Sequence, residues 1–522
     1  MSHQIRAGSR DLDTRDKLRG DSHPVPPSPE KLGGLEVVAF GSLTLAVVVA
    51  VIVLPPLIAG GALLGVGLIY LFRSVLLNWT TMLFILVGVI LFIPVRRYAV
   101  PIPLPFALEP YRMVVAGLLV AFALLLVTRP ELRKIRIPFL LPIGVFVASI
   151  LVAFAANIVG LTQSDLVTGG IGSIFQTVFL LSIAVIVRRL LTSERVVFIL
   201  LTFIVWGTVL VALGALAERL VKVNVFLLLG NVLPLTLLRD ESQSLRAGGA
   251  RSYASSQHPI ALAVFFCMVI PLAIYLAKYA VWPRYELNRT LLYGAGIVII
   301  FGGMLTAVSR TGVGVLAVMF LLILLLRPLL ALKLALIALP FVFLGAAIVP
   351  KLFDSTVLSF FDVDTLIGSQ YASLGLKGQG RLADLAPAFA EVSQVPFFGT
   401  GPGSRIVVGA NANAFILDSQ VLGTLLENGA VGVIGLAALC LIPPIILLAR
   451  SFRPGVDAKY GLLGVAVALS MGGYVAALFF YDAFSFFQTF MMFMVLLAIG
   501  GWLLDEKLTV APKRLVAGAI SR

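Results

Sequence analysis

Charge is scarce in this chain. Only 12% of its 522 residues are charged, whereas 60% are hydrophobic, and the mean hydropathy is +1.06. Soluble domains carry about 25% charged residues and do not need this much apolar surface. The composition therefore excludes a soluble globular protein and indicates a protein that crosses a membrane many times.

Cysteines and acidic residues are also few. Both cysteines, Cys267 and Cys440, lie inside apolar runs, where a thiol behaves as a small hydrophobic group and says nothing about the redox compartment.

The 39 lysines and arginines exceed the 25 aspartates and glutamates, and the net charge is +14. No basic stripe alternates with stacking aromatic residues, so nucleic-acid binding is not expected. The positive-inside bias of membrane proteins explains much of the excess.

Long apolar runs dominate the rest of the chain. A membrane span needs about 20 mostly apolar residues, and several of the candidate runs are short or closely abutted. The sequence therefore predicts an all-α fold, a polytopic transmembrane helix bundle of about 12–14 spans with a large extracytoplasmic helical loop. The candidate spans are 36–55, 57–73, 79–95, 113–128, 138–158, 172–187, 196–216, 259–277, 290–308, 313–326, 330–349, 420–448, 460–480 and 484–504.

The basic residues are divided unequally between the two sides of these spans. With fourteen spans and a cytoplasmic N-terminus, 26 of the 39 lysines and arginines are cytoplasmic and 13 lie outside. This asymmetry follows the positive-inside rule and predicts that both termini are cytoplasmic. Residues 1–35 mix charge with proline and are expected to form a disordered tail. Residues 36–504 then form the transmembrane domain, and 505–522 a second cytoplasmic tail.

Three arginine-bearing stretches face outward under this topology. They are residues 246–258 in an outer loop over 217–258, residues 309–312 in a tight helix reversal, and a large outer loop over 350–419. Cations at the mouth of a bilayer core usually mark a pathway, an anionic ligand or a partner charge. Phosphate is the leading candidate ligand, although any single arginine also fits a side chain that reaches lipid headgroups.

The large outer loop contains a predicted amphipathic helix. Arg381 opens it, and Pro387 near its first turns is expected to bend it. Such a helix suits either the membrane surface or the lid of a cavity. Its apolar residues at helical spacing are Leu382, Leu385, Phe389 and Val392.

Arg310 is the strongest candidate for phosphate binding. It follows Ser309 between two long apolar runs, so it stands where a new helix begins and offers unpaired backbone N–H groups. A guanidinium matches two phosphate oxygens at once. The alternative is an arginine that packs against a carboxylate.

Three further residues are candidates for acid–base chemistry. His258 follows Arg251 by seven residues and directly precedes a span, where it is either a polar helix cap or a catalytic group. Asp418 and Glu427 bracket the start of the predicted span 420–448. Asp418 is expected either to cap that helix or to accept a proton from an attacking hydroxyl.

The order of these motifs resembles the O-antigen ligase and polymerase family of bacterial membrane glycosyltransferases. The resemblance covers roughly residues 215–450 and is absent from the first two hundred residues except as hydrophobic spans. The motifs that carry it are Arg251 with His258-Pro259, Ser309 to Gly312, Gly380-Arg381, the turn with Pro396, Gly399, Gly401 and Gly403, and Leu426-Glu427 with Gly429 and Gly432.

The resemblance implies transfer of a glycan from a polyprenyl-diphosphate carrier to an acceptor hydroxyl, with inversion and without a metal or other cofactor. The expected partners are that donor, a glycan or lipid acceptor and membrane lipids, and the expected location is the bacterial cytoplasmic membrane. Arg251 and Arg310 match the positions that grip the diphosphate, with Arg246, Arg381 and Ser309 as further substrate-binding candidates. Ligases of this family have a histidine where this chain has Asp418, which favours a polymerase or a related transferase.

The main alternative is a transporter or flippase of an anionic lipid-linked substrate, because such a protein also places arginines in a membrane cavity. Transporters often contain repeated halves with matched broken spans. The sequence shows no internal repeat. The enzyme is therefore the favoured interpretation.

Overall fold

The computed structural model describes residues 79–101, 107–128, 135–238, 245–246, 249–364, 367–368, 385–406, 413–414 and 417–508. The chain divides into two units, Met1–Leu77 and Asn78–Arg522, and all described residues belong to the second. The predicted N-terminal tail and the first two predicted spans therefore lie outside the described residues. So does the predicted C-terminal tail after its first four residues.

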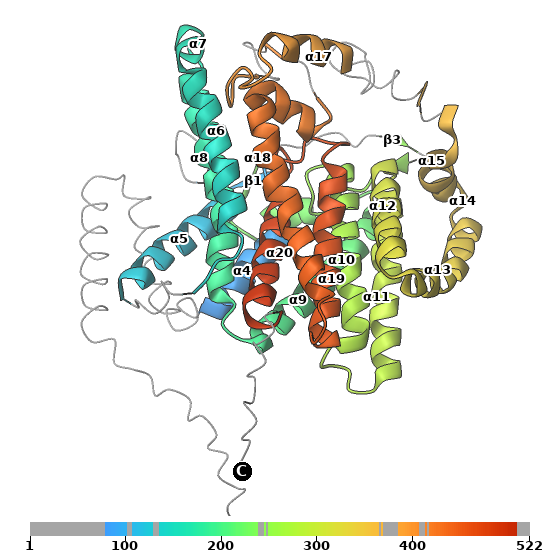
Figure 1. Cartoon of the computed structure of the whole chain (residues 1–522). Helices are drawn as coiled ribbons and strands as arrows, with labels where there is room; N and C mark the ends of the chain where they lie inside the picture. The colour runs from blue at the N-terminus through green and yellow to red at the C-terminus, as the bar shows by residue number, and fades with distance from the viewer. Residues whose placement is uncertain are drawn as a thin grey trace, which may run out of the picture. The chain divides into compact units, whose positions relative to one another are not determined.

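The described chain is an all-α helix bundle of a multi-pass membrane protein (Figure 1). Within the described residues, eight helices are long and apolar enough to cross a membrane, and four more, α4, α5, α6 and α12, are shorter apolar helices. Each predicted span from 79–95 onward coincides with one of them, which confirms the predicted fold class. The helices are α4 (Trp79–Phe92), α5 (Pro110–Thr128), α6 (Leu140–Ala156), α8 (Val167–Leu190), α9 (Glu194–Val221), α10 (Pro259–Tyr279), α11 (Glu286–Thr306), α12 (Arg310–Leu326), α13 (Pro328–Ile348), α18 (Gln420–Ser451), α19 (Ala458–Ala477) and α20 (Phe487–Glu506).

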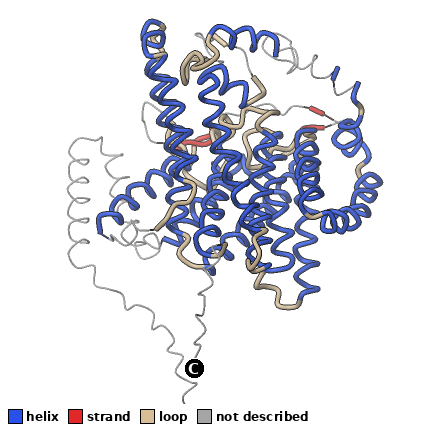
Figure 2. Tube along the Cα trace, viewed as in Figure 1, coloured by secondary structure: helices blue, strands red, loops and turns tan. Residues whose placement is uncertain are grey.

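Short elements connect these helices. The two described two-stranded sheets are antiparallel: β1 (Tyr98–Ala99) pairs with β2 (Thr236–Leu237), and β3 (Leu245–Arg246) pairs with β4 (Gly249–Ala250) (Figure 2). The first sheet ties the loop after α4 to the loop after α9. The remaining short helices are α7 (Ile158–Gln163), η3 (Val225–Asn231), α14 (Pro350–Phe353), η4 (Asp354–Leu358), α15 (Ser359–Phe361) and α17 (Leu385–Gln394).

The core lies around α10, α19 and α20. The most apolar window of α20 is 94% buried, whereas that of α13 is only 6% buried. Both helices are strongly apolar, so hydropathy alone does not separate a central helix from a peripheral one. An apolar helix with so little protein cover is suited to contact with lipid on most of its surface.

One end of the bundle carries a cluster of basic residues. Glu194 at the start of α9 forms ion pairs with Lys459 Nζ at 2.7 Å and with Lys507 Nζ at 3.2 Å. Arg188 Nη2 forms an ion pair with Asp505 Oδ2 at 2.8 Å. These pairs join α8, α9, α19 and α20 at the same level. We call this the basic end, and it comprises Arg188, Arg189, Arg195, Lys278, Arg284, Arg289, Arg450, Arg453, Lys459 and Lys507.

The opposite end of the same helices holds the predicted chemistry. There α4, α9, α11 and α19 end, and α5, α10, α12, α18 and α20 begin. We call it the site end, and its charged and titratable residues discussed below are Arg96, Arg97, Glu109, Glu218, Arg251, His258, Arg310, Asp418 and Asp482.

Helix α18 reverses direction within its range. Gly429 has φ +63 and ψ −164, which are not helical values. A Cβ placed on Gly432 would lie 3.3 Å from Cγ2 of Thr424, although residues eight apart in a continuous helix are separated by about 12 Å along its axis. The segment before Gly429 therefore folds back beside the segment after it, so the predicted continuous span over 420–448 is wrong at its start.

Candidate functional site

The extended segment from Arg251 to His258 lies against the reversal between α11 and α12. Ser252 donates its backbone N–H to Thr306 O at 3.1 Å, and Arg251 Nε donates to Ala307 O at 2.9 Å. Arg251 is buried, with 5% of its surface exposed. Two motifs separated by about fifty residues in the sequence therefore meet at one place, three residues before Arg310.

The reversal itself is strained and incompletely capped. Val308 has φ +44, a conformation that a β-branched residue rarely adopts and that costs about 1–3 kcal/mol. Ser309 is the N-cap residue of α12, yet its side chain makes no capping hydrogen bond. Its Oγ is buried and has no hydrogen-bond partner among the described residues. The first turn of α12 thus lacks the side-chain acceptor that a serine at this position normally supplies.

Arg310 extends from this turn towards α15. Its Nε donates to Ser359 Oγ at 3.1 Å, and Ser359 Oγ donates to Ser355 O at 2.7 Å. Thr356 in the adjacent η4 is fully buried, and its Oγ1 has no hydrogen-bond partner within the described part of the chain. Gly312 allows close packing here, because a Cβ on it would lie 3.0 Å from Cβ of Ala263 in α10. A guanidinium, a helix start and a buried hydroxyl therefore meet at one turn.

His258 is the N-cap residue of α10. Its Nδ1 accepts the backbone N–H of Ile260 at 3.2 Å, which confirms the predicted cap. Because a backbone N–H only donates, the neutral imidazole that makes this bond carries its proton on Nε2. The other ring nitrogen is then a hydrogen-bond donor, which suits a phosphate or hydroxyl oxygen better than it suits the role of base. The ring lies 5.7 Å from the ring of Phe486.

Buried polar groups hold the segment from Arg251 to His258 in place. Glu218 Oε2 accepts the backbone N–H groups of Tyr253 at 3.2 Å and Ala254 at 2.8 Å. Asn224 Nδ2 donates to Ala254 O at 2.9 Å, and Ala254 has φ +45. Arg97 Nη2 donates to Gln257 O at 2.9 Å. Glu218 is not among the site residues predicted from the sequence, although a carboxylate in the last turn of a span is a signal for a buried partner.

Asp418 is exposed and precedes α18. The N-cap residue of α18 is Ser419, whose Oγ accepts the backbone N–H of Leu422 at 3.5 Å, so the predicted cap at Asp418 is wrong. Gln420 links this position to the loop before α20, because its Oε1 accepts the backbone N–H of Phe484 at 2.7 Å. The carboxylate of Asp418 is close enough to Asp482 in that loop to raise the pKa of Asp482.

Asp482 belongs to a charged cluster that the sequence analysis missed. Burial raises the pKa of Asp482 and of Glu109, and burial also lowers the pKa of Arg96. The three groups offset these costs, because Arg96 attracts both carboxylates; its backbone N–H also donates to Glu109 Oε2 at 2.6 Å. The guanidinium of Arg96 lies 4.4 Å from the ring centre of Phe487. The available signal was an aspartate enclosed by aromatic residues between two spans.

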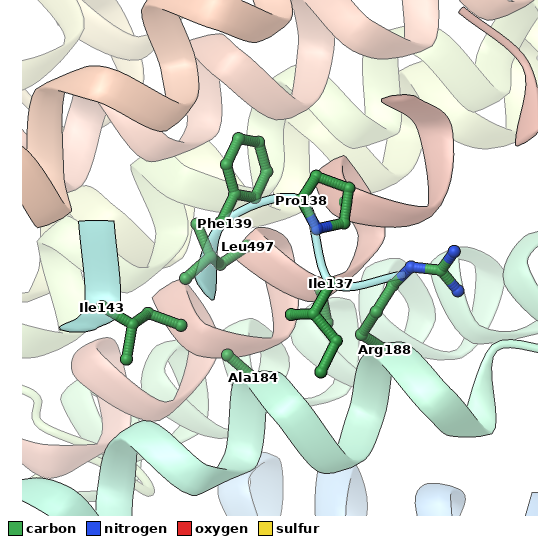
Figure 3. A pocket seen from close by; sticks show the side chains of 9 residues that line it. Ile137, Pro138, Phe139, Ile143, Ala184, Arg188 and Leu497 are labelled. Atoms are coloured by element: carbon green, nitrogen blue, oxygen red, sulfur yellow. The ribbon is translucent and has the colours of Figure 1, made fainter. Parts of the chain in front are cut away.

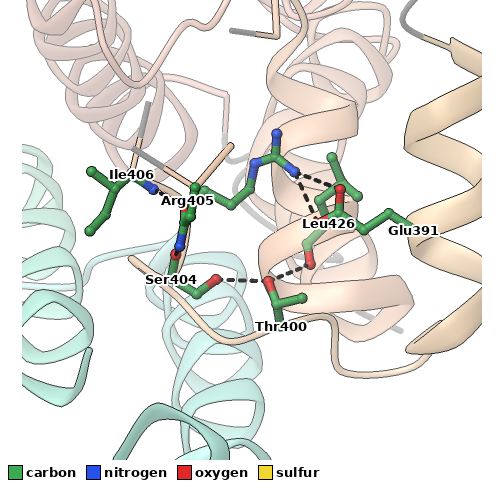
Figure 4. Close-up of polar contacts among 7 residues, drawn as sticks. Glu391, Thr400, Ser404, Arg405, Ile406 and Leu426 are labelled. Atoms are coloured by element: carbon green, nitrogen blue, oxygen red, sulfur yellow. Dashed lines mark hydrogen bonds and ion pairs between the residues drawn. The ribbon is translucent and has the colours of Figure 1, made fainter. Parts of the chain in front are cut away.

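Glu427 lies in a structural joint, where the charged groups that act on its carboxylate are Asp482 and Arg405. The backbone N–H groups of Gly403 and Arg405 donate to its carboxylate. At the same joint, Thr400 N donates to Leu426 O at 2.9 Å, and Thr400 Oγ1 lies 3.2 Å from the same oxygen and 2.7 Å from Ser404 Oγ (Figure 4). The predicted glycine turn and the predicted Leu-Glu-x-Gly motif therefore form one unit.

Glycine is required at two positions of this joint for steric reasons. Gly399 and Gly429 have positive φ, and a Cβ on either would lie within 2.4 Å of backbone atoms of the other segment. Across the joint, Ala430 N donates to Pro396 O at 2.9 Å and Val431 N to Phe397 O at 3.2 Å. The carbonyl groups of Pro396 and Phe397 thus accept from backbone N–H groups that the reversal of α18 leaves without helical partners.

The other predicted residues of the large loop are only partly described. Arg381 and Leu382 lie outside the described residues, whereas Arg246 is paired in the β3–β4 sheet, where its backbone alone is described. Helix α17 confirms the predicted loop helix over its described part, and Pro387 lies within it. Arg405 Nη1 lies 3.3 Å from both carboxylate oxygens of Glu391 in α17 (Figure 4).

The geometry thus separates the predicted site residues into two groups. Arg251, His258, Ser309 and Arg310 belong to one neighbourhood at the site end, and Asp418 lies in the same end beside Asp482. Glu427 belongs to the α18 joint. No family model matches this chain, and no curated protein matches it significantly.

Proposed function

We propose that this protein transfers or polymerises glycans, taking them from a polyprenyl-diphosphate donor and placing them on an acceptor hydroxyl with inversion. The observation that carries the proposal is the first turn of α12. There Arg310, an uncapped helix start and the buried hydroxyl of Ser309 meet beside Arg251. Helix starts and guanidinium groups both favour phosphate oxygens.

The residues then have distinct roles. The acceptor oxygen forms its bond to the anomeric carbon while the bond from that carbon to the diphosphate breaks, and the diphosphate leaves with the electron pair. Arg310 stabilises the growing negative charge, which preorganised donors in a partly dry site do well. Asp418 takes the proton of the acceptor hydroxyl, and His258 donates a hydrogen bond through Nε2.

The proposal also fixes a location and an orientation. The site end faces outward in the bacterial cytoplasmic membrane, and both termini are cytoplasmic. The clustering of basic residues at the opposite end supports this, because such clusters mark the cytoplasmic side. The donor and acceptor are therefore lipid-linked or outer-face glycans.

Turnover by the purified protein tests the proposal. Reconstituted protein supplied with a polyprenyl-diphosphate glycan and an acceptor glycan is expected to release polyprenyl diphosphate and form a longer glycan. Arg310→Ala should reduce the rate by about a hundredfold or more, and Arg310→Lys should also be impaired, because an ammonium lacks the planar fork.

Arg289→Ala is the matched control. Arg289 is half-buried like Arg310 and also binds through Nε, to Ala277 O at 3.2 Å, but it lies at the basic end. Full activity of Arg310→Ala at normal expression would refute the role of this arginine. Movement of the lipid-linked glycan across the vesicle membrane without product would instead favour the transporter.

A further inference from the structure

The turn between α19 and α20 carries two consecutive exposed phenylalanines. Phe479 and Phe480 are 62% and 40% exposed, whereas the next residue, Tyr481, is buried. Phe480 donates its backbone N–H to Ala477 O at 2.8 Å, so the pair stands on a tight turn directly after α19. Packing in the core therefore does not explain these two rings.

Hydrogen bonds hold this turn beside Asp418. The backbone N–H of Gln420 is shared between Leu478 O at 2.9 Å and Tyr481 O at 3.1 Å, which are the carbonyl groups on either side of the two phenylalanines. Gln420 Oε1 also accepts the backbone N–H of Phe484 at 2.7 Å. Asp418 lies two residues before Gln420 and is exposed. The two rings and this carboxylate therefore lie beside each other at the surface.

The same turn extends to the neighbourhood of the arginines. The ring of Phe486 lies 5.7 Å from the ring of His258 and 5.4 Å from that of Tyr481. Residues 478–486 therefore connect His258 with Asp418, the two groups to which the proposed reaction gives acid–base and hydrogen-bonding roles.

The exposed carboxylate defines the surroundings of the rings. An ionised carboxylate is costly in hydrocarbon, so Asp418 lies in water or among lipid headgroups. Because the turn is bonded to the residues next to Asp418, Phe479 and Phe480 lie near the same level. A ligand that fits this surface must combine an apolar face with polar groups at its edge.

A sugar ring has both features. The C–H groups on one face of a pyranose are polarised by the ring and hydroxyl oxygens, and their partial positive charge is attracted to the negative face of an aromatic ring. The hydroxyl groups at its edge donate hydrogen bonds that a carboxylate accepts. An acyl chain would leave the carboxylate without a donor, and a phosphate would be repelled by it.

The recess at the basic end is too small for such a ligand. Phe139, Arg188 and Leu497 are among the residues at its wall (Figure 3), and it has room for about one water molecule. A sugar residue is several times larger than a water molecule. A glycan therefore needs an open surface such as the one around Phe479.

We infer that Phe479 and Phe480 form an aromatic platform on which one sugar residue of the acceptor glycan stacks, with its attacking hydroxyl directed to Asp418. This inference rests on the proposed function, because it takes Asp418 as the group that receives the hydroxyl proton. The platform selects acceptor sugars that present an uninterrupted C–H face, since an axial hydroxyl on that face would hold the rings away.

Photo-crosslinking in the cell membrane tests the contact without assuming turnover. The photoreactive analogue p-benzoylphenylalanine replaces Phe479, and after irradiation the adducts are identified by mass spectrometry as carbohydrate or phospholipid. Phe397, which is 67% exposed at the joint of α18, is the matched control position. We expect carbohydrate adducts at position 479 and none at position 397. Phospholipid adducts alone at position 479, no adducts there, or equal carbohydrate at both positions would overturn the inference.

Kinetics in the reconstituted turnover assay test the role of the ring. Phe479→Leu keeps an apolar side chain but removes the aromatic face, so the KM for the acceptor glycan should rise about fivefold while the KM for the donor stays unchanged. Phe479→Trp should restore the acceptor KM, and Phe397→Leu should match the wild type. An unchanged acceptor KM in Phe479→Leu, or an equal rise in Phe397→Leu, would contradict the platform.

The two tests separate this inference from the proposed function. Carbohydrate adducts at position 479 of a protein that shows no turnover would refute the proposed reaction and leave the glycan-binding surface in place. Turnover without such adducts would refute the aromatic platform alone.

Discussion

Two tight helix reversals stand at the site end, and they are built differently. In the reversal of α18, the positive φ falls on Gly429, and the inserted turn around Gly399 restores the broken hydrogen bonds. In the reversal from α11 to α12, the positive φ falls on Val308, and the hydroxyl of Ser309 is left without a partner among the described residues. The first reversal has its backbone hydrogen bonds restored, although Asn428 Oδ1 beside it is buried without a partner among the described residues. The second combines a buried hydroxyl without such a partner with a helix start and the guanidinium of Arg310.

The comparison suggests how to distinguish a structural motif from a binding motif. Both reversals contain glycines and conspicuous polar residues, so Glu427 and Arg310 are both site candidates in the sequence. A strained backbone whose broken hydrogen bonds are replaced by neighbouring backbone groups indicates a structural role. Strain that accompanies an unsatisfied hydroxyl at a helix start beside a cationic side chain points to an anionic ligand.

The largest expected effect is at the joint of α18. Gly429→Ala would place a Cβ about 2.3 Å from the backbone of Phe397, at a φ of +63. We expect loss of folded protein, measured as a collapse of the monodisperse peak in detergent size exclusion. Gly423→Ala is the control, because no atom lies within 4 Å of a Cβ there. Normal folding of Gly429→Ala would remove the distinction between the two reversals.

The next effect concerns acceptor activation by Asp418. Because Ser419 and not Asp418 caps α18, Asp418→Asn should leave thermal stability unchanged. Loss of a general base reduces the rate by about a hundredfold to ten-thousandfold, while donor binding should persist. Near-normal transfer by this variant would exclude Asp418 as the base, and the same substitution at Asp482 should then be assayed.

A smaller effect is expected from the residue that positions the Arg251–His258 segment. Glu218→Gln keeps an oxygen for the backbone N–H groups of Tyr253 and Ala254, because both bonds use the single atom Oε2. Glu218→Ala removes it. We expect kcat to fall by about tenfold or more in the alanine variant and to be largely rescued in the glutamine variant. Equal loss in both would show that the negative charge, not the hydrogen bonds, is what matters.

The smallest effect concerns Ser309. Its hydroxyl is buried without a partner within the described residues, so Ser309→Ala should leave the ligand-free protein as stable as the wild type or slightly more stable. Donor affinity should nevertheless fall by about fivefold, since a hydrogen bond contributes a net ~1 kcal/mol. Thermal unfolding with and without donor lipid measures both. A destabilised ligand-free protein would indicate a structural hydroxyl instead.

Hydropathy was sufficient to predict the helices because membrane spans are defined by length and apolarity. Hydropathy failed at Gly429, because the segments on both sides are apolar and the break between two helices is not visible in a hydropathy pattern. The motifs at Arg251, His258 and Arg310 could be found in the sequence, because they are charged or titratable residues on the predicted outer side and because their order resembles that of a known family. Glu218, Glu109 and Asp482 carried weaker signals, because what distinguishes them is burial. Glu218 bonds to Ala254 and Asp482 interacts with Arg96, both far away in the sequence, whereas Glu109 is buried beside Arg96 and Arg112 of its own region.

The central claim is that the first turn of α12 binds phosphate whereas the joint of α18 does not. Binding of a polyprenyl diphosphate without a sugar, titrated into reconstituted protein, tests it most directly. We predict that Arg310→Ala weakens this binding by about tenfold or more, and that Thr400→Val at the α18 joint leaves it within about twofold of the wild type. Unchanged binding by Arg310→Ala, or an equal loss in both variants, would contradict the account.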